Sequence, residues 1–430
     1  MGVTLIISQG ATGIVFVTIR PKWLPLIGCI FAFRRLKLKH KYAFLAFQEL
    51  TKTYGPILGL KLGNQKVVVI STHDLVKKVL LQDEFNGRPD GFFFKVRAFG
   101  KKKGQSIMEK HLTIEAQNLV NYLHRASAKG PVLMHTAFDI AVLNSLWYMF
   151  AGHTFDYENE KLQEILQTVH DAFRLMDTMG GIVSQMPFLR FIIPELSGYN
   201  DLMRILQKLW NFLDEEISVH EKQLSRNQPE NLIEAFLLEI SSKSSDCDDS
   251  IFNRENLLVV CLDLFLAGSK TTTDTLAAIF LFLSLHPEWI KILQKELDTV
   301  LGRSRSPSVE DYSSLPMMES FLAEIQRFLN LAPFGLPHKT MKNTILNGYT
   351  IPKNNSNIPF GLGKRRCPGE TLARTTLFLF FAYVIHYFDI EISPEHGKPD
   401  PDGHDGFTIS PKSYYLKLTA RSDIINSVTV

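Results

Sequence analysis

The sequence has little of what marks several protein classes. It contains only four cysteines in 430 residues, and their wide spacing indicates neither a disulfide framework nor a cysteine-ligated zinc site. Its net charge is only +3 and its basic residues are scattered, so the composition does not favour nucleic-acid binding. We find no internal repeats and no linker that would divide the chain. The scarcity of cysteine fits a reducing, cytosol-facing location.

The composition is that of a globular protein with a large core, 45% hydrophobic and 21% charged. Residues 1–19 carry no charge, but they are short for a membrane span and are diluted by Ser8, Gln9, Gly10 and Gly13. Arg20 and Lys22 begin a basic flank after this segment. The pattern leaves two alternatives, a membrane anchor or a disordered or interfacial leader.

The rest of the chain reads as one mainly helical domain with a small β-sheet region. Asn256–Leu285 is apolar enough to suggest a second membrane helix, but Asp263, Lys270 and Asp274 would be costly in a bilayer, so we predict a buried central helix. Turn signals and periodicity predict a hairpin over 55–71, helices over 72–81, 162–179, 198–224, 229–240 and 315–329, and a strand over 413–418.

One cysteine lies in an unusual loop, Phe360–Glu370, directly before a long apolar helical pattern. Three nearby cations and the positive end of the helix favour the thiolate form of Cys367. Three positions of the loop are glycines without a side chain, so a flat, bulky group could approach the loop backbone closely. A thiolate flanked by arginines that can hold carboxylates suits an iron porphyrin with two propionates. The alternative is a basic turn with an incidental cysteine.

The pattern Phe360-x-x-Gly363-x-Arg365-x-Cys367-x-Gly369 resembles the haem-binding signature of the cytochrome P450 superfamily. Trp23–Gly28 resembles the proline-rich hinge that follows the membrane anchor in the microsomal animal branch of this superfamily. The resemblance implies that Cys367 is the proximal thiolate ligand of haem and that Arg365 contacts a haem propionate. It also implies that Phe360 packs beside the sulfur, and that Gly363 and Gly369 belong to the haem-binding loop.

A second motif, Ala267–Thr272, lies midway along the predicted central helix. Glycine weakens a helix, and threonines can bond back to the preceding turn, which together would make room for a small ligand such as O2. A buried helix that merely tolerates Gly268 is the alternative. The motif resembles the oxygen-activation motif of the family, which implies that Ala267 and Gly268 face the haem. It also implies that Thr271 hydrogen-bonds oxygen and relays protons.

Lys270 departs from that motif, because the family usually has an acidic residue before the threonine. An ammonium group cannot simply replace a carboxylate in proton delivery, although Asp274 lies one helical turn on and could pair with it. We therefore expect slow turnover, with more reduced oxygen lost as peroxide. Equal coupling in the chain and in a Lys270→Glu variant would contradict this expectation.

Glu324 and Arg327 lie three residues apart on a predicted helix and resemble the Glu-x-x-Arg clamp of the family. His338 lies where family members carry a histidine or arginine that contacts a propionate, although a lone histidine is also a common surface or core residue. Pro187–Pro194 is a hydrophobic connection that is either an ordinary packed loop or, by the resemblance, a substrate entrance that dips into the membrane.

Two segments that the family carries are missing, so the P450 fold is expected to be incomplete. No Trp-x-x-x-Arg helix lies between Gly104 and Gln105, and no strands, helix or Pro-Glu-Arg-Phe-like loop lie between Asn357 and Ile358. Both look like clean excisions, as from skipped exons or a truncated gene model. Without the clamp arginine of the second segment, Glu324–Arg327 would be a half-satisfied buried charge network, which is costly.

The resemblance implies a haem-thiolate monooxygenase that inserts one oxygen atom from O2 into a lipophilic small molecule. NADPH–cytochrome P450 reductase would supply the electrons, with cytochrome b5 as a further candidate partner. Residues 1–19 would anchor the chain in the endoplasmic reticulum membrane, and 20–430 would form the haem domain facing the cytosol. The alternatives are a non-catalytic truncated relative that acts, if at all, by binding, and peroxide chemistry at a thiolate haem. The sequence does not identify the substrate.

Overall fold

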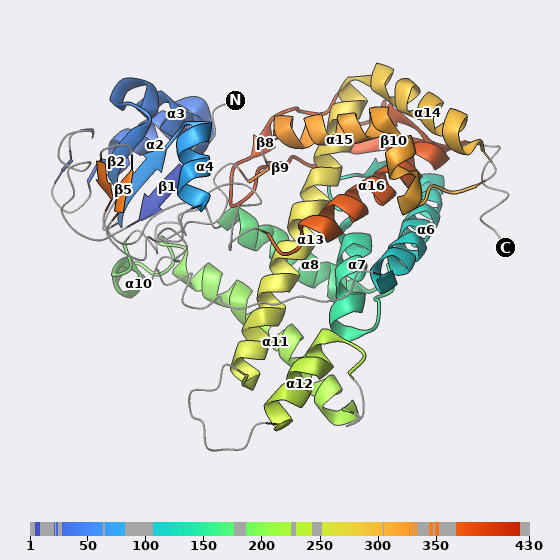
Figure 1. The fold of residues 1–430 in the computed structure, drawn as a ribbon, viewed down its shortest axis with the longest axis horizontal. Coiled ribbons are helices and arrows are strands. Elements are labelled where there is room, and N and C mark those ends of the chain that lie inside the picture. Colours follow the sequence, from blue (N-terminus) through green and yellow to red (C-terminus); the bar gives the residue numbers. More distant parts are fainter. Residues whose placement is uncertain are drawn as a thin grey trace.

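The computed structural model shows a mainly helical protein with small antiparallel sheets, which confirms the predicted fold class (Figure 1). The described residues are 5–8, 21, 23–24, 28–62, 65–81, 106–175, 186–224, 229–242, 252–303, 305–329, 331–332, 344–346, 349–351 and 367–421.

The N-terminal part has its own small core. Helices α2 (Ile30–His40) and α3 (Ala43–Tyr54) pack together, with the rings of Phe33 and Phe47 stacked at 4.4 Å. Strands β2 (Ile57–Leu62) and β3 (Gln65–Ile70) form the predicted hairpin, and α4 (His73–Leu81) follows as predicted. The buried faces of the hairpin and of α3 form one apolar cluster.

Strand β1 (Leu5–Ser8) pairs antiparallel with β3, so that the sheet order is β1-β3-β2. These four residues belong to the segment expected to anchor the chain in a membrane. Residues 1–4 and 9–20 lie outside the described residues, and the anchor stays a prediction.

The larger part is built on helices most of which share one extensive apolar core, whereas the short α10 buries no residue. Figure 1 shows α13 as the long yellow helix that runs through this part. Its helices are α6 (Ser106–Lys129), α7 (Asp139–Ala151), α8 (Glu160–Leu175), α10 (Leu189–Ile192), α11 (Tyr199–Gln223), α12 (Leu232–Ser242), α13 (Arg254–Leu285), α14 (Pro287–Leu301), the 3-10 helix η2 (Val309–Ser314), α15 (Pro316–Leu329) and α16 (Glu370–Tyr387).

Helix α13 confirms the predicted buried central helix. It begins at an N-cap, where the Asn253 side chain accepts a hydrogen bond of 2.8 Å from the Asn256 backbone N–H, and it ends before Pro287. Most of its side chains are buried against α7, α11 and α16. Among the described helices, none alone is long and apolar enough to cross a membrane, and α13 with α14 meets those criteria only as a pair bent by 108°.

Short strands complete the C-terminal part. β4 (Val132–Leu133), β10 (Tyr415–Ala420) and β7 (Phe388–Ile392) form one sheet, and β8 (Gly403–His404) pairs with β9 (Ser410–Pro411). A further hairpin joins β5 (Thr344–Leu346) to β6 (Tyr349–Ile351). Near β8 the two parts of the molecule meet, because Lys37 of α2 forms an ion pair of 2.6 Å with Asp405.

Candidate functional site

The Ala267–Thr272 motif, predicted to lie beside bound oxygen, forms an accessible patch on the otherwise buried helix α13. Ala267 is exposed, and Gly268 and Thr271 are half-buried, whereas the neighbouring positions Ser269 and Lys270 are buried. The Thr271 hydroxyl donates a hydrogen bond of 2.7 Å to the Ala267 carbonyl, the predicted bond to the preceding turn. The helix is nevertheless continuous through these residues. The motif therefore presents small and hydroxyl-bearing side chains to open space.

Close packing of two helices requires glycine at position 268, which the sequence alone did not reveal. A Cβ atom built at this position would lie 2.3 Å from Cδ2 of Leu146 on α7, well inside van der Waals contact. The glycine thus lets α7 approach α13 closely, whatever it does for a ligand on the other side of the helix.

Cys367 lies three residues before the start of α16. Gly369 is the N-cap residue of that helix, and its carbonyl accepts a hydrogen bond of 2.8 Å from the Ala373 N–H. The sulfur is therefore held near the positive end of the helix dipole, as the sequence predicted. A Cβ atom added at Gly369 would lie 4.0 Å from the Cys367 sulfur, in van der Waals contact. The glycine keeps the space beside the half-buried Cys367 clear.

Helices α13 and α16 pack together, so the fold joins the element that carries Thr271 to the one that follows Cys367. The remaining predicted site residues, namely His338, Phe360, Gly363 and Arg365, lie outside the described residues.

Lys270 forms the predicted ion pair with Asp274, and the pair is buried. The Lys270 side chain is 1% exposed and that of Asp274 is 0% exposed. The second carboxylate oxygen of Asp274 accepts hydrogen bonds of 3.0 Å from the Thr408 hydroxyl and 2.8 Å from the Ser410 hydroxyl. Consecutive helical residues point about 100° apart. The Lys270 amine is thus bound on the buried side of α13, away from the accessible side that Thr271 shares.

A buried histidine cluster lies near this ion pair. Burial is the main cause that lowers the pKa of His135 to about 3, and the charge of Lys270 contributes, so His135 is neutral at pH 7. His170 lies beside it, with ring centroids 4.9 Å apart, and its Nε2 is 2.7 Å from an Asp139 carboxylate oxygen. No local pattern predicts this cluster, because His135 lies between β4 and α7, Asp139 begins α7 and His170 lies on α8.

The known proteins that this chain resembles agree on one family. The cytochrome P450 family model matches residues 20–108, 94–356 and 354–418. Farnesoate epoxidase of Bombyx mori is 30% identical over 464 aligned positions, which cover 93% of both chains. Probable cytochrome P450 305a1 of Drosophila melanogaster is 28% identical with 94% of both chains covered, and cytochrome P450 2B19 of Mus musculus is 27% identical with 93% covered.

The chain belongs to the cytochrome P450 family. Members of this family bind haem through a cysteine thiolate, so haem is the cofactor of this P450, and its family chemistry is that of a haem monooxygenase. The described residues fit the group, because Cys367 is a soft sulfur ligand beside a position without a side chain, and Ala267 and Thr271 face open space.

The family match is interrupted where the sequence predicted missing segments. Its three parts meet at residues 94–108 and 354–356, close to the predicted excisions after Gly104 and Asn357. The alignment with the Bombyx mori protein has 464 positions, more than the 430 residues of this P450. The Bombyx mori protein therefore carries residues that this chain lacks. The two junctions lie outside the described residues.

The predicted burial of the Glu324–Arg327 clamp is wrong. The two side chains form a bidentate pair, with Arg327 Nε donating to Glu324 Oε2 at 2.7 Å, but they are 61% and 58% exposed. Water solvates the carboxylate, and the guanidinium holds its pKa below its usual range. The cost expected for a half-satisfied buried network therefore does not arise at this pair.

Proposed function

We propose that this P450 is a haem-thiolate monooxygenase of the endoplasmic reticulum membrane that inserts one atom of O2 into a lipophilic small molecule. Its electrons come from NADPH through cytochrome P450 reductase, with cytochrome b5 as a further candidate donor. The observation that carries the proposal is the packing of α13, with accessible Ala267 and Thr271, against α16, which follows Cys367. Similarity to relatives such as cytochrome P450 2B19 of Mus musculus supports the monooxygenase part of this proposal.

Each residue has a defined task in this proposal. Haem, when bound, supplies the activation of O2 and the oxidising power. Cys367 holds the iron through its thiolate, and Gly369 leaves room beside the sulfur. The Thr271 hydroxyl, now bonded to the Ala267 carbonyl, holds a proton at Oγ1 and can exchange that hydrogen bond for one to a ligand in the open space.

The remaining haem contacts are proposed from the family resemblance. Arg365 and His338 would bind the haem propionates, Phe360 would pack beside the sulfur, and Gly363 would let the loop approach the macrocycle. By the resemblance, Ala267 and Gly268 would lie on the haem-facing side of α13, although a Cβ at Gly268 would point toward Leu146 of α7.

Exposed apolar side chains around α10 support membrane contact and a lipophilic substrate. Phe191 is 76% exposed, Ile192 is 69% exposed and Leu196 is 82% exposed, next to Phe188 at 55%. The exposure of these side chains favours the entrance alternative for Pro187–Pro194 over an ordinary packed loop. Contiguous exposed apolar residues mark membrane or protein contacts, and a lipid-soluble substrate would arrive from the same phase.

The reduced carbon-monoxide difference spectrum of the full chain tests the proposal. We expect a thiolate-type Soret band that is lost in Cys367→Ser. Cys261→Ser is the matched control, because Cys261 is buried on α13 and burial raises its pKa to about 12, so it remains a thiol. Oxidation of lipophilic test substrates that requires NADPH, reductase and O2 would then establish the monooxygenase, whereas activity with peroxide alone would indicate the peroxide chemistry.

A non-catalytic role is the second candidate, and the interrupted family match favours it. The residues that this chain lacks include expected haem contacts. Whether the chain retains haem therefore distinguishes the two candidate functions. A full chain that folds but shows no thiolate-type band would support the non-catalytic role and refute the monooxygenase.

A further inference from the structure

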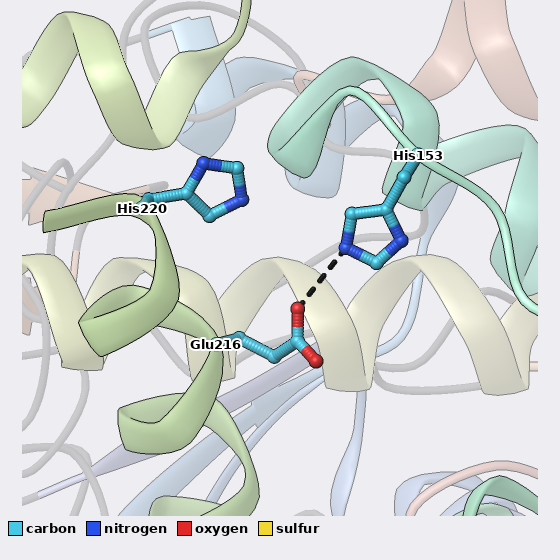
Figure 2. Close-up of side chains that lie close together, drawn as sticks. All are labelled: His153, Glu216 and His220. Carbon is cyan, nitrogen blue, oxygen red and sulfur yellow. Dashed lines mark hydrogen bonds and ion pairs between the residues drawn. The ribbon is translucent and has the colours of Figure 1, made fainter. Parts of the chain in front are cut away.

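Three side chains that the haem site does not use converge at the end of α7. His153 follows Gly152, the C-cap of α7, while Glu216 and His220 lie one turn apart on α11. One ligand atom from each lies within 4.8 Å of the other two. Figure 2 shows the three side chains pointing toward a common centre, with His153 bonded to Glu216.

The local structure fixes this convergence. Residues four apart share one face of a helix, so Glu216 and His220 face the same way. Gly152 has φ +74°, a left-handed conformation that favours glycine, and a Cβ there would lie 3.2 Å from the Asn231 amide nitrogen. The chain therefore turns sharply after α7 and delivers His153 to the face of α11.

His220 is the unusual member of the group. Its side chain is only 7% exposed, yet neither ring nitrogen has a hydrogen bond to the described residues. A buried polar group without a hydrogen-bond partner destabilises the folded protein. In Figure 2 the nitrogen at the tip of the ring lies on the side that faces His153 and Glu216. A buried imidazole nitrogen is thus directed, without a partner, into a cluster of potential ligands.

Glu234 of α12 lies behind His220. Its Oε1 is 3.5 Å from the Nδ1 atom of His220. The Asn231 amide donates to the same carboxylate oxygen at 2.9 Å and holds it in place. A carboxylate behind a histidine is the arrangement that orients metal-ligating imidazoles, with the proton on Nδ1 and Nε2 left to bind.

We propose that His153, Glu216 and His220 bind a zinc ion, with Glu234 orienting His220. Two imidazoles and one carboxylate are ligands that zinc prefers, and three protein ligands leave a fourth position for water. Ligand atoms around tetrahedral zinc lie about 3.3 Å apart, given Zn–N bonds of about 2.0 Å. His153 is 42% exposed and can move to close the site. The bound ion would tie the end of α7 to α11.

The simpler explanation is that His153 and Glu216 form an ordinary surface pair. They are 3.1 Å apart. His286 and Glu288 form such a pair at 3.5 Å, with side chains 48% and 63% exposed, and they belong to no three-ligand group among the described residues. This pair therefore supplies a matched control that has a histidine and a carboxylate but no buried third ligand.

Equilibrium dialysis of the full-length haem protein, prepared without a polyhistidine tag, against buffered free Zn²⁺ tests the site. Elemental analysis should find one more zinc per chain in the parent and in His286→Gln than in His153→Gln. Glu216→Gln is the second variant and should lose the same equivalent. Glu234→Gln should keep the site but weaken its affinity about 10–100-fold.

Equal zinc content and affinity in the parent, His153→Gln and Glu216→Gln would overturn the proposal. Zinc held by other groups, including Cys367 in any haem-free fraction, is common to all these proteins and cancels in the difference. The carbon-monoxide spectrum should be the same in the parent and in His153→Gln, so that the outcome is independent of the haem assignment.

Discussion

Replacing Lys270 with methionine removes the cation from a buried ion pair while keeping most of the side-chain volume. In the parent, the Lys270 amine binds one oxygen of Asp274, and the Thr408 and Ser410 hydroxyls bind the other. In Lys270→Met the carboxylate keeps both hydroxyl donors but loses its countercharge. Its side chain is 0% exposed, so water cannot take the place of the amine.

Removing one partner of a buried ion pair costs about 3–5 kcal/mol, because the other charge is left uncompensated. The two remaining hydrogen bonds place Lys270→Met near the lower end, at about 3 kcal/mol. The double variant Lys270→Met, Asp274→Asn should recover most of this loss. In the double variant, the side-chain amide oxygen at position 274 can still accept hydrogen bonds from the Thr408 and Ser410 hydroxyls, and no charged group remains buried.

Urea unfolding followed by the loss of helical circular dichroism measures these differences. Lys417→Met is the matched control, because Lys417 pairs with Glu391 at 3.2 Å on the surface, with side chains 55% and 64% exposed. That variant should cost no more than about 1 kcal/mol. If Lys270→Met costs no more than Lys417→Met, or if the double variant is no better than Lys270→Met, the reasoning about the buried pair is refuted.

Three further predictions follow from the same structure. An unfolded histidine takes up a proton near pH 6.5, whereas folded His135 stays neutral down to about pH 3; stability should therefore fall with pH below 6.5 by up to about 1.4 kcal/mol per pH unit from this residue, and His135→Gln should show a shallower fall in urea unfolding at pH 6.5 and 5.5. Gly268→Ala should destabilise by about 1–3 kcal/mol through overpacking against Leu146, and Leu146→Val should partly rescue it; equal stability of Gly268→Ala and the parent would contradict the close approach. Phe191→Ser with Leu196→Ser should reduce sedimentation of the protein with phospholipid vesicles, whereas Ile292→Ser with Val300→Ser, at exposed apolar positions on α14, should not.

Patterns that act over a few residues predicted much of the fold. The hairpin over 55–71 was recognisable from alternating β-formers around a glycine turn, and the structure has β2 and β3 there. Helix α11 (Tyr199–Gln223) agrees closely with its predicted range, because its apolar periodicity matches the face that it buries. Central helix α13 also agrees with its range, because a long apolar stretch that contains charges costly in a bilayer indicates a buried helix. The Lys270–Asp274 pair followed from four-residue spacing alone.

Features that depend on distant segments could not be predicted in this way. His153 and Glu216 are 63 positions apart in the chain, and His135 and His170 are 35 apart, so that no local spacing relates them. The exposure of Glu324 and Arg327 depends on which segments cover α15, which their own spacing does not encode. The close approach of Leu146 gives Gly268 a second role that a reading of α13 alone could not show.

The buried position of Lys270 changes how its effect on proton delivery must be tested. Lys270→Glu would place a second carboxylate beside Asp274, where neither group is exposed and where Thr408 and Ser410 already bind Asp274. One carboxyl group would have to be protonated or the helix displaced, so poor coupling in that variant could arise from damage to α13. Lys270→Met with Asp274→Asn removes both charges while keeping the hydroxyl contacts, and Thr271 stays in place. If loss of reduced oxygen as peroxide is the same in that variant as in the parent, the charge of Lys270 does not act on proton delivery.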